Sequence, residues 1–80
     1  MTTKILLFGI TTDLLGASSL DLEIPVNSSI ADFKQHLLAK HPVLENINSY
    51  AIAVNESYAS DEIIITENDV IAIIPPVSGG

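Results

Sequence analysis

The sequence of 80 residues contains no cysteine and no arginine. Without cysteine, disulfide bonds, thiolate metal sites and a catalytic thiol are all excluded. Three lysines face ten acidic residues, and the formal net charge is −7. Nucleic-acid binding requires a basic face that contacts phosphates, so this balance argues against such a partner. It favours a partner protein with a basic surface, or it serves solubility alone.

Long apolar runs and active-site motifs are also absent. The run Ile5–Phe8 is far too short for a signal-peptide core or a membrane span, so we expect a cytoplasmic protein without a membrane partner. The two histidines, His36 and His41, are five residues apart and do not share a helical face. Gly9 and Gly16 are isolated and form no phosphate-binding loop. We therefore expect no metal, no bound cofactor and no active site of the chain's own.

Apolar side chains are abundant enough for one small domain. They make up 48% of the chain, which is typical of a globular protein and not of a disordered one. Eighty residues leave no room for a second domain. We expect a folded domain over residues 1–76 and a flexible C-terminal tail over residues 77–80.

The first part of the chain predicts two strands. Lys4–Ile10 is a β-rich run, and small residues around Gly16 indicate a turn. Apolar and polar residues then alternate over Leu20–Val26 with the period of a strand that buries one face. Pro25 points to the end of this strand or to a sheet edge. The two strands should form a hairpin.

One amphipathic helix is predicted over about residues 29–40. Ser28 or Ser29 can cap its N-terminus, and Asp32 lies in the first turn, where a negative charge suits the helix dipole. Apolar residues recur at helical spacing and should face a sheet. Pro42 ends the helix, because the residue before a proline disfavours the α conformation.

Three more strands are predicted after the helix. Tyr50–Val54 is the first, and Tyr58–Ala59 is a short strand at an edge. Val70–Ile74 is apolar throughout, which places it in the middle of the sheet. The order is β-β-α-β-(β)-β. It predicts an α+β fold in which a mixed sheet of four to five strands packs on one main helix.

The C-terminal residues carry the strongest functional signal. After the last predicted strand the sequence continues Pro75-Pro76-Val77-Ser78-Gly79-Gly80. The two prolines stiffen the exit from the strand and remove two backbone donors. Gly79 and Gly80 have no Cβ, so their backbone can enter a narrow channel. A stiff neck and a flexible tip suit insertion into another protein's site, with the Gly80 carboxylate as the group to be activated.

The stretch Ile73–Gly80 resembles the C-terminal signature of the small subunit of molybdopterin synthase. That family consists of ubiquitin-like β-grasp sulfur carriers. The resemblance covers essentially the whole chain, since the length and the order of elements fit. Ala53-Val54-Asn55 is similar to the family's Val-Asn at the end of its third main strand, and Asn68-Asp69-Val70 stands where the family has Gly-Asp-Glu-Val. The chain departs at Thr12-Asp13-Leu14, where the family often has Arg-Glu-Leu.

The resemblance implies a sulfur carrier that is not an enzyme on its own. An E1-like adenylating enzyme would use ATP to attach AMP to the Gly80 carboxylate, and a sulfur donor would displace AMP to leave a thiocarboxylate. The tail would then enter the large subunit of molybdopterin synthase, in a heterotetramer of two small and two large subunits. Its sulfur would attack cyclic pyranopterin monophosphate to build the dithiolene of the molybdenum cofactor. A sulfur carried on the C-terminus needs no cysteine.

The predicted partner-binding surface surrounds the exit of this tail. Phe8 and Ile73 should lie at the ends of two neighbouring strands; alternatively, Phe8 points into the core and the docking surface lies elsewhere. The residues predicted to bind partners are Phe8, Ile73, Pro75, Pro76, Val77, Ser78 and Gly79.

Three alternatives share the fold or the C-terminal residues. The first is a sulfur carrier for thiazole or tRNA thiolation, although thiazole carriers are usually shorter and lack the Pro-Pro-Val-Ser neck. The second is a ubiquitin-like protein modifier, which only conjugates on target lysines would distinguish. The third is an interaction domain whose tail has no role.

Overall fold

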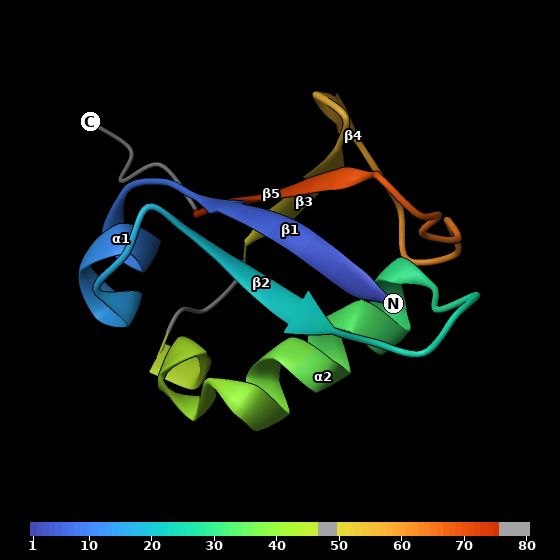
Figure 1. Ribbon diagram of the computed structural model, residues 1–80. Helices are drawn as coiled ribbons and strands as arrows, with labels where there is room; N and C mark the ends of the chain where they lie inside the picture. The colour runs from blue at the N-terminus through green and yellow to red at the C-terminus, as the bar shows by residue number, and fades with distance from the viewer. Residues whose placement is uncertain (47–49, 76–80) are drawn as a thin grey trace.

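The computed structural model describes residues 1–46 and 50–75 and shows a five-stranded mixed sheet with helices on one of its faces (Figure 1). The strands lie in the order β2-β1-β5-β3-β4. β1 runs antiparallel to β2 and parallel to β5, and β3 runs antiparallel to both β5 and β4. The elements are β1 (Thr2–Leu7), α1 (Ile10–Leu15), β2 (Ser19–Glu23), α2 (Ile30–Lys40), a 3-10 helix η1 (Pro42–Asn46), β3 (Ala51–Val54), β4 (Ser57–Tyr58) and β5 (Val70–Ile74).

The structure confirms the predicted hairpin, the main helix and the central position of the last strand. β1 pairs with β2 in the antiparallel register expected of a hairpin, and β2 is an edge strand that ends two residues before Pro25. β5 lies between β1 and β3. A strand with neighbours on both sides and helices on one face is largely removed from water, which is why its sequence is apolar throughout.

The first predicted strand was too long. β1 ends at Leu7, and Ile10 begins α1, a short helix that the sequence did not predict. Gly9 turns the chain out of the sheet with a φ of 56°. The Thr11 hydroxyl then accepts a hydrogen bond of 3.0 Å from the Phe8 amide and donates one to the Phe8 carbonyl, which closes the first turn. The second strand was also too long, since β2 ends at Glu23 and not at Val26.

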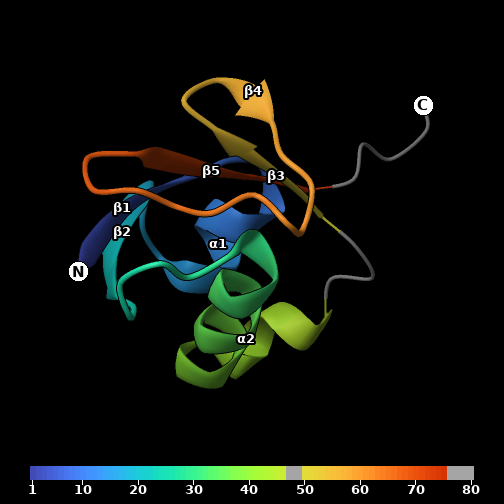
Figure 2. The same ribbon diagram turned by 90° about the vertical axis from the view of Figure 1, so that its right-hand side faces the viewer.

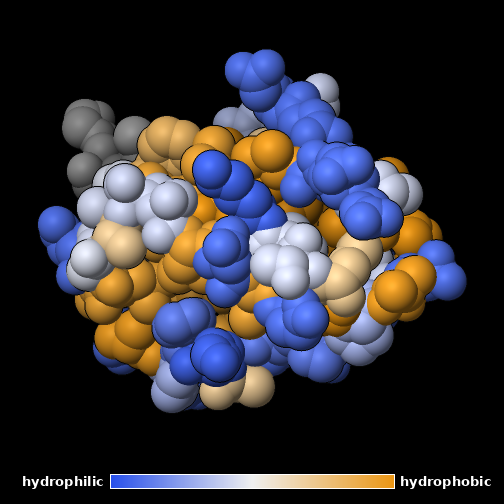
Figure 3. Space-filling model, viewed as in Figure 1, coloured by the Kyte–Doolittle hydropathy of each residue, from blue (hydrophilic) through white to orange (hydrophobic). Residues whose placement is uncertain are grey.

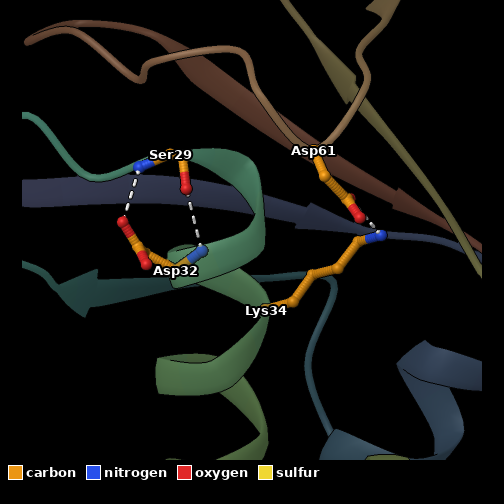
Figure 4. A network of polar contacts seen from close by, with 4 residues as sticks. All are labelled: Ser29, Asp32, Lys34 and Asp61. Carbon is orange, nitrogen blue, oxygen red and sulfur yellow. Dashed lines mark hydrogen bonds and ion pairs between the residues drawn. The ribbon is translucent and has the colours of Figure 1, made fainter.

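Helix α2 begins with all four of its N-terminal amides bonded. The Ser29 hydroxyl accepts from the Asp32 amide, and the Asp32 carboxylate accepts from the Ser29 amide, both at 3.1 Å (Figure 4). The amides of residues 30 and 31 donate to carbonyls of the segment between β4 and β5, and the amide of residue 33 donates to the Ser29 carbonyl. An ion pair of 2.8 Å between Lys34 and Asp61 joins the same segment to the helix (Figure 4). Both side chains are partly exposed, so this pair contributes at most about 1 kcal/mol.

One hydrophobic core lies between the sheet and α2. Figure 2 shows α1 and α2 on the same side of the sheet, which leaves the other side, called here the open face, without a helix. In the described part of the chain, no helix has the length and apolar character needed to cross a membrane. The core residues are Ile5, Leu7, Leu22, Ile24, Ile30, Phe33, Leu37, Leu44, Ile52, Ile65, Ile71 and Ile73.

Candidate functional site

The alternation of side chains along β5 decides which residues reach the open face. Ile71 and Ile73 are fully buried against the helices, so Val70, Ala72 and Ile74 point the other way. β1 alternates in step with β5, because Leu6 pairs with Ala72 and Leu7 with Ile73. Leu6 therefore joins Ala72 and Ile74 on the open face.

These side chains form an apolar groove of about 330 Å³ on the open face. Phe8 and Tyr58, two of the four aromatic residues in the chain, lie along it with 49% and 76% of their surface exposed. Figure 3 shows apolar surface along the upper edge of the molecule, as far as the hydrophilic corner at β4. A contiguous exposed apolar surface is a mark of a protein-binding site. The residues that line this apolar groove are Leu6, Phe8, Ala53, Asn55, Glu56, Tyr58, Val70, Ala72 and Ile74.

The structure settles the position of two residues that the sequence predicted to bind partners. Phe8 is half exposed and lines the apolar groove, so the alternative that placed it in the core is wrong. Ile73 is fully buried in the core, so its predicted place on the docking surface needs correction. The neighbouring Ile74 has the orientation that was predicted for Ile73.

The last described residue, Pro75, lies at the end of the apolar groove that Phe8 and Ile74 line. Pro75 is partly buried and directly follows Ile74. It lies so close to Gly9 that a Cβ at Gly9 would be 3.0 Å from Cγ of Pro75. The glycine thus allows both the turn at the end of β1 and the close approach of the last described residue. The other residues predicted to bind partners or react, which are Pro76, Val77, Ser78, Gly79 and Gly80, lie outside the described residues.

A hydrogen-bond network fixes the opposite end of the groove. The Asn55 amide group donates to the Asp69 carboxylate at 2.8 Å, and its carbonyl oxygen accepts from the Val70 amide at 3.0 Å. Asp69 also accepts from the amide of Thr66 at 2.8 Å and from its hydroxyl at 3.0 Å. These bonds tie the turn between β3 and β4 to the start of β5.

This network gives a prediction for the effect of pH on stability. The Thr66 amide, and after it the Asn55 side chain, lower the pKa of Asp69 by bonding its charged form. A lowered folded-state pKa stabilises the fold above the unfolded-state pKa of about 3.9, and this stabilisation is lost as the pH falls through the folded-state value. We expect Asp69→Asn to lose less stability than wild type between pH 6 and pH 3, measured by urea unfolding.

The control for this prediction is Asp13→Asn in α1. It removes the same charge, and Asp13 forms no side-chain hydrogen bond in the described part of the chain. It should lose stability with falling pH as wild type does. Equal pH dependence in the Asp69 and Asp13 variants would show that the network does not depend on the Asp69 charge. Because Asp69 is only partly buried, solvent screens its charge and the expected difference is small.

The arrangement suits binding more than catalysis. Among residues 1–46 and 50–75, no group of three or more His, Cys, Asp or Glu side chains could hold a metal ion. The apolar groove offers an apolar floor, two aromatic side chains and one carboxylate. Sequence reasoning missed most of its lining residues, which come from β1, β3, β4 and β5 and from the turns that follow β1 and β3. Two features of the sequence could have identified Ile74. It directly precedes Pro75, and in the parallel pairing of β1 with β5 it follows Ile73 as Phe8 follows Leu7.

Comparisons with known proteins agree on the family and the fold. Residues 5–80 match the ThiS family. The molybdopterin synthase sulfur carrier subunit of Arabidopsis thaliana is 40% identical over 78 residues, which cover 96% of this chain and 81% of that protein. The crystal structure of SAMP1 from Haloferax volcanii matches with a TM-score of 0.87 at 21% identity, over 100% of both chains. A chain in the Helicobacter pylori complex of subunits 1 and 2 of molybdopterin-converting factor matches with a TM-score of 0.71 at 21% identity, also over 100% of both.

These structural likenesses establish a ubiquitin-like β-grasp fold, as the resemblance to the sulfur-carrier family implied. The sequence comparison is more specific, since its identity extends over nearly the whole chain. The chain belongs to the ThiS family and groups with its molybdopterin synthase sulfur carrier subunits.

Proposed function

We propose that this protein is the sulfur carrier subunit of molybdopterin synthase. The observation that carries the proposal is the 40% identity, over 96% of the chain, to the plant sulfur carrier subunit. The residues Pro75-Pro76-Val77-Ser78-Gly79-Gly80 support it, because two stiff prolines followed by glycines without a Cβ suit entry into a narrow site of a partner. The absence of cysteine agrees with a sulfur atom carried on the C-terminus.

The proposed chemistry takes place at the carboxylate of Gly80. An E1-like adenylating enzyme uses ATP to form the acyl adenylate and releases pyrophosphate. A sulfur donor then displaces AMP and leaves a thiocarboxylate, whose sulfur attacks cyclic pyranopterin monophosphate. The catalytic groups belong to the partner proteins in this scheme. The small subunit is a cosubstrate that is consumed at its terminus and can be loaded again.

The apolar groove is the proposed docking site of the large subunit. It extends to Pro75, the last described residue before the tail, because Ile74 lines the groove and directly precedes Pro75. Gly9, the chain neighbour of Phe8, also lies close to Pro75. A surface at the base of the tail can hold the partner while the terminus reaches into its active site. The fold likeness to a chain in a complex of subunits 1 and 2 supports a large-subunit partner. We further propose a heterotetramer of two small and two large subunits.

The proposed function is tested by intact mass spectrometry of the protein purified from its own host. One oxygen replaced by sulfur at the C-terminus is the expected product. The loaded protein, mixed with the large subunit and cyclic pyranopterin monophosphate, should form the dithiolene. Loaded protein that is inactive with this precursor but supports thiazole or tRNA thiolation would contradict the proposal. Isopeptide conjugates on target lysines would indicate a protein modifier instead.

The groove gives a second prediction, for Phe8→Ala. Phe8 is half exposed in the isolated chain, so its removal should change the thermal midpoint little. Loss of an aromatic anchor should weaken binding to the large subunit by about 1–3 kcal/mol. Most of the loss should appear as faster dissociation, which surface plasmon resonance can measure.

The control for Phe8→Ala is Val26→Ala. Val26 is 70% exposed, and it does not line the apolar groove. This variant should bind as wild type does. A Phe8 variant with a lower thermal midpoint and unchanged affinity would assign Phe8 to the fold, and the docking surface would then lie elsewhere.

A further inference from the structure

The turn between β3 and β4 has an unusual residue in a left-handed conformation. Ala53 pairs with Tyr58 and Val54 with Ser57, so Asn55 and Glu56 form a two-residue hairpin loop. Their φ angles are 50° and 71°. Two positive φ angles are typical of a type I′ turn, whose preferred sequence is Asn-Gly. Asn55 fits its position, but Glu56 stands where glycine is preferred.

A left-handed conformation costs free energy for any residue that has a Cβ, and asparagine and aspartate tolerate it better than glutamate. The Glu56 side chain makes no contact with the described residues that would offset this free-energy cost. The carboxylate is exposed, and in the described part of the chain it forms no hydrogen bond or ion pair. When a strained backbone conformation is not offset by any stabilising contact of the side chain, a functional role for that residue can be inferred.

The position of Glu56 suggests that function. It lines the apolar groove between Asn55 and Tyr58, at the end opposite Pro75. Of the described residues that line the groove, it alone is charged. The hydrogen bonds of Asn55 to Asp69 and Val70 hold this turn to β5, so the backbone that carries the Glu56 carboxylate is fixed in position. Figure 1 shows β4 at the edge of the sheet, on the side away from α2.

We propose that Glu56 is a specificity-determining residue, which pairs with a lysine or arginine side chain of the large subunit docked on the apolar groove. The inference rests on the proposed function, which supplies that partner. Apolar contacts alone do not fix the position of a bound partner along the groove. One ion pair at the end of the groove does fix it. A net charge of −7 already favours a basic partner surface, and a docked protein would shield this pair from water.

The test compares Glu56→Gln and Glu56→Gly with wild type. Each variant is titrated against the wild-type large subunit at low and high salt, and its thermal midpoint is measured alone. Glu56→Gln should weaken binding about tenfold at low salt and reduce the salt dependence of the affinity. Glu56→Gly should weaken binding as much, while it raises the thermal midpoint by about 4–8 °C through relief of the left-handed glutamate. Higher stability together with weaker binding is a result that a purely structural role would not produce.

Glu45→Gln is the matched control. It removes the same charge from η1, which packs with α2 and not on the open face, so it should bind like wild type. Equal affinities for wild type and Glu56→Gln, or equal losses in Glu56→Gln and Glu45→Gln, would overturn the inference and leave the proposed function intact. If the wild-type protein itself does not bind the large subunit, the proposed function fails, and the inference fails with it.

Discussion

Adding one alanine after Gly80, or deleting Gly80, should abolish sulfur transfer by the reconstituted synthase and leave the thermal midpoint unchanged. Among the described residues the core extends from Ile5 to Ile73, so we expect it to form without the tail. The reacting carboxylate, in contrast, must reach a fixed centre in a partner protein. One residue moves the end of an extended chain by about 3.5 Å. Since a displacement of about 1 Å can reduce a rate about 100-fold, the extended protein should show no measurable transfer.

The experiment can separate the activation step from the transfer step. Sulfur is loaded chemically onto both the wild-type and the extended terminus, so that the adenylating enzyme is not needed. A loss of dithiolene formation that persists with the loaded proteins belongs to the synthase. Full activity of the extended, loaded protein would contradict the proposed placement of the terminus. A fall in thermal midpoint would show that the tail packs against the domain.

Local signals were sufficient to predict the main helix and the middle of the sheet. Ser29 and Asp32 form a reciprocal cap that depends only on residues three apart, and the apolar spacing of α2 repeats over three turns. β5 is apolar on both faces, which is typical of a central strand. Such features follow from short stretches of sequence and are visible without a structure.

The errors arose at one local turn and at positions whose orientation distant residues decide. Ile10 was placed in the first strand, because the apolar run continues past Leu7 and only the Gly9 turn, closed by Thr11, ends it. The orientation of Ile73 was not readable from β5 itself. A strand without alternation carries no sign of which residues face the helices, and pairing with Leu7 settles it. The apolar groove was missed for the same reason, since strands far apart in sequence supply its residues.

The neighbouring residues Ile73 and Ile74 should respond to alanine substitution in opposite ways. Ile73 is fully buried, so Ile73→Ala removes core contacts and leaves a cavity. It should lower the free energy of unfolding by about 2–5 kcal/mol. Small domains have only about 5–15 kcal/mol in total, so this loss is a large part of the stability and should be plain in urea unfolding.

Ile74→Ala should keep most of that stability and lose affinity instead. Its side chain lies on the open face, where it lines the apolar groove next to Pro75. Binding to the large subunit should weaken by about 1–3 kcal/mol if Ile74 is an anchor of the interface. The affinity of Ile73→Ala, measured on its folded fraction, should stay close to wild type, because the core side chain does not reach the partner. Equal destabilisation by both substitutions would mean that Ile74 is buried as deeply as Ile73, and the open face would then not be the docking surface. The pair therefore tests the fold and the proposed interface with two substitutions of the same size, one residue apart.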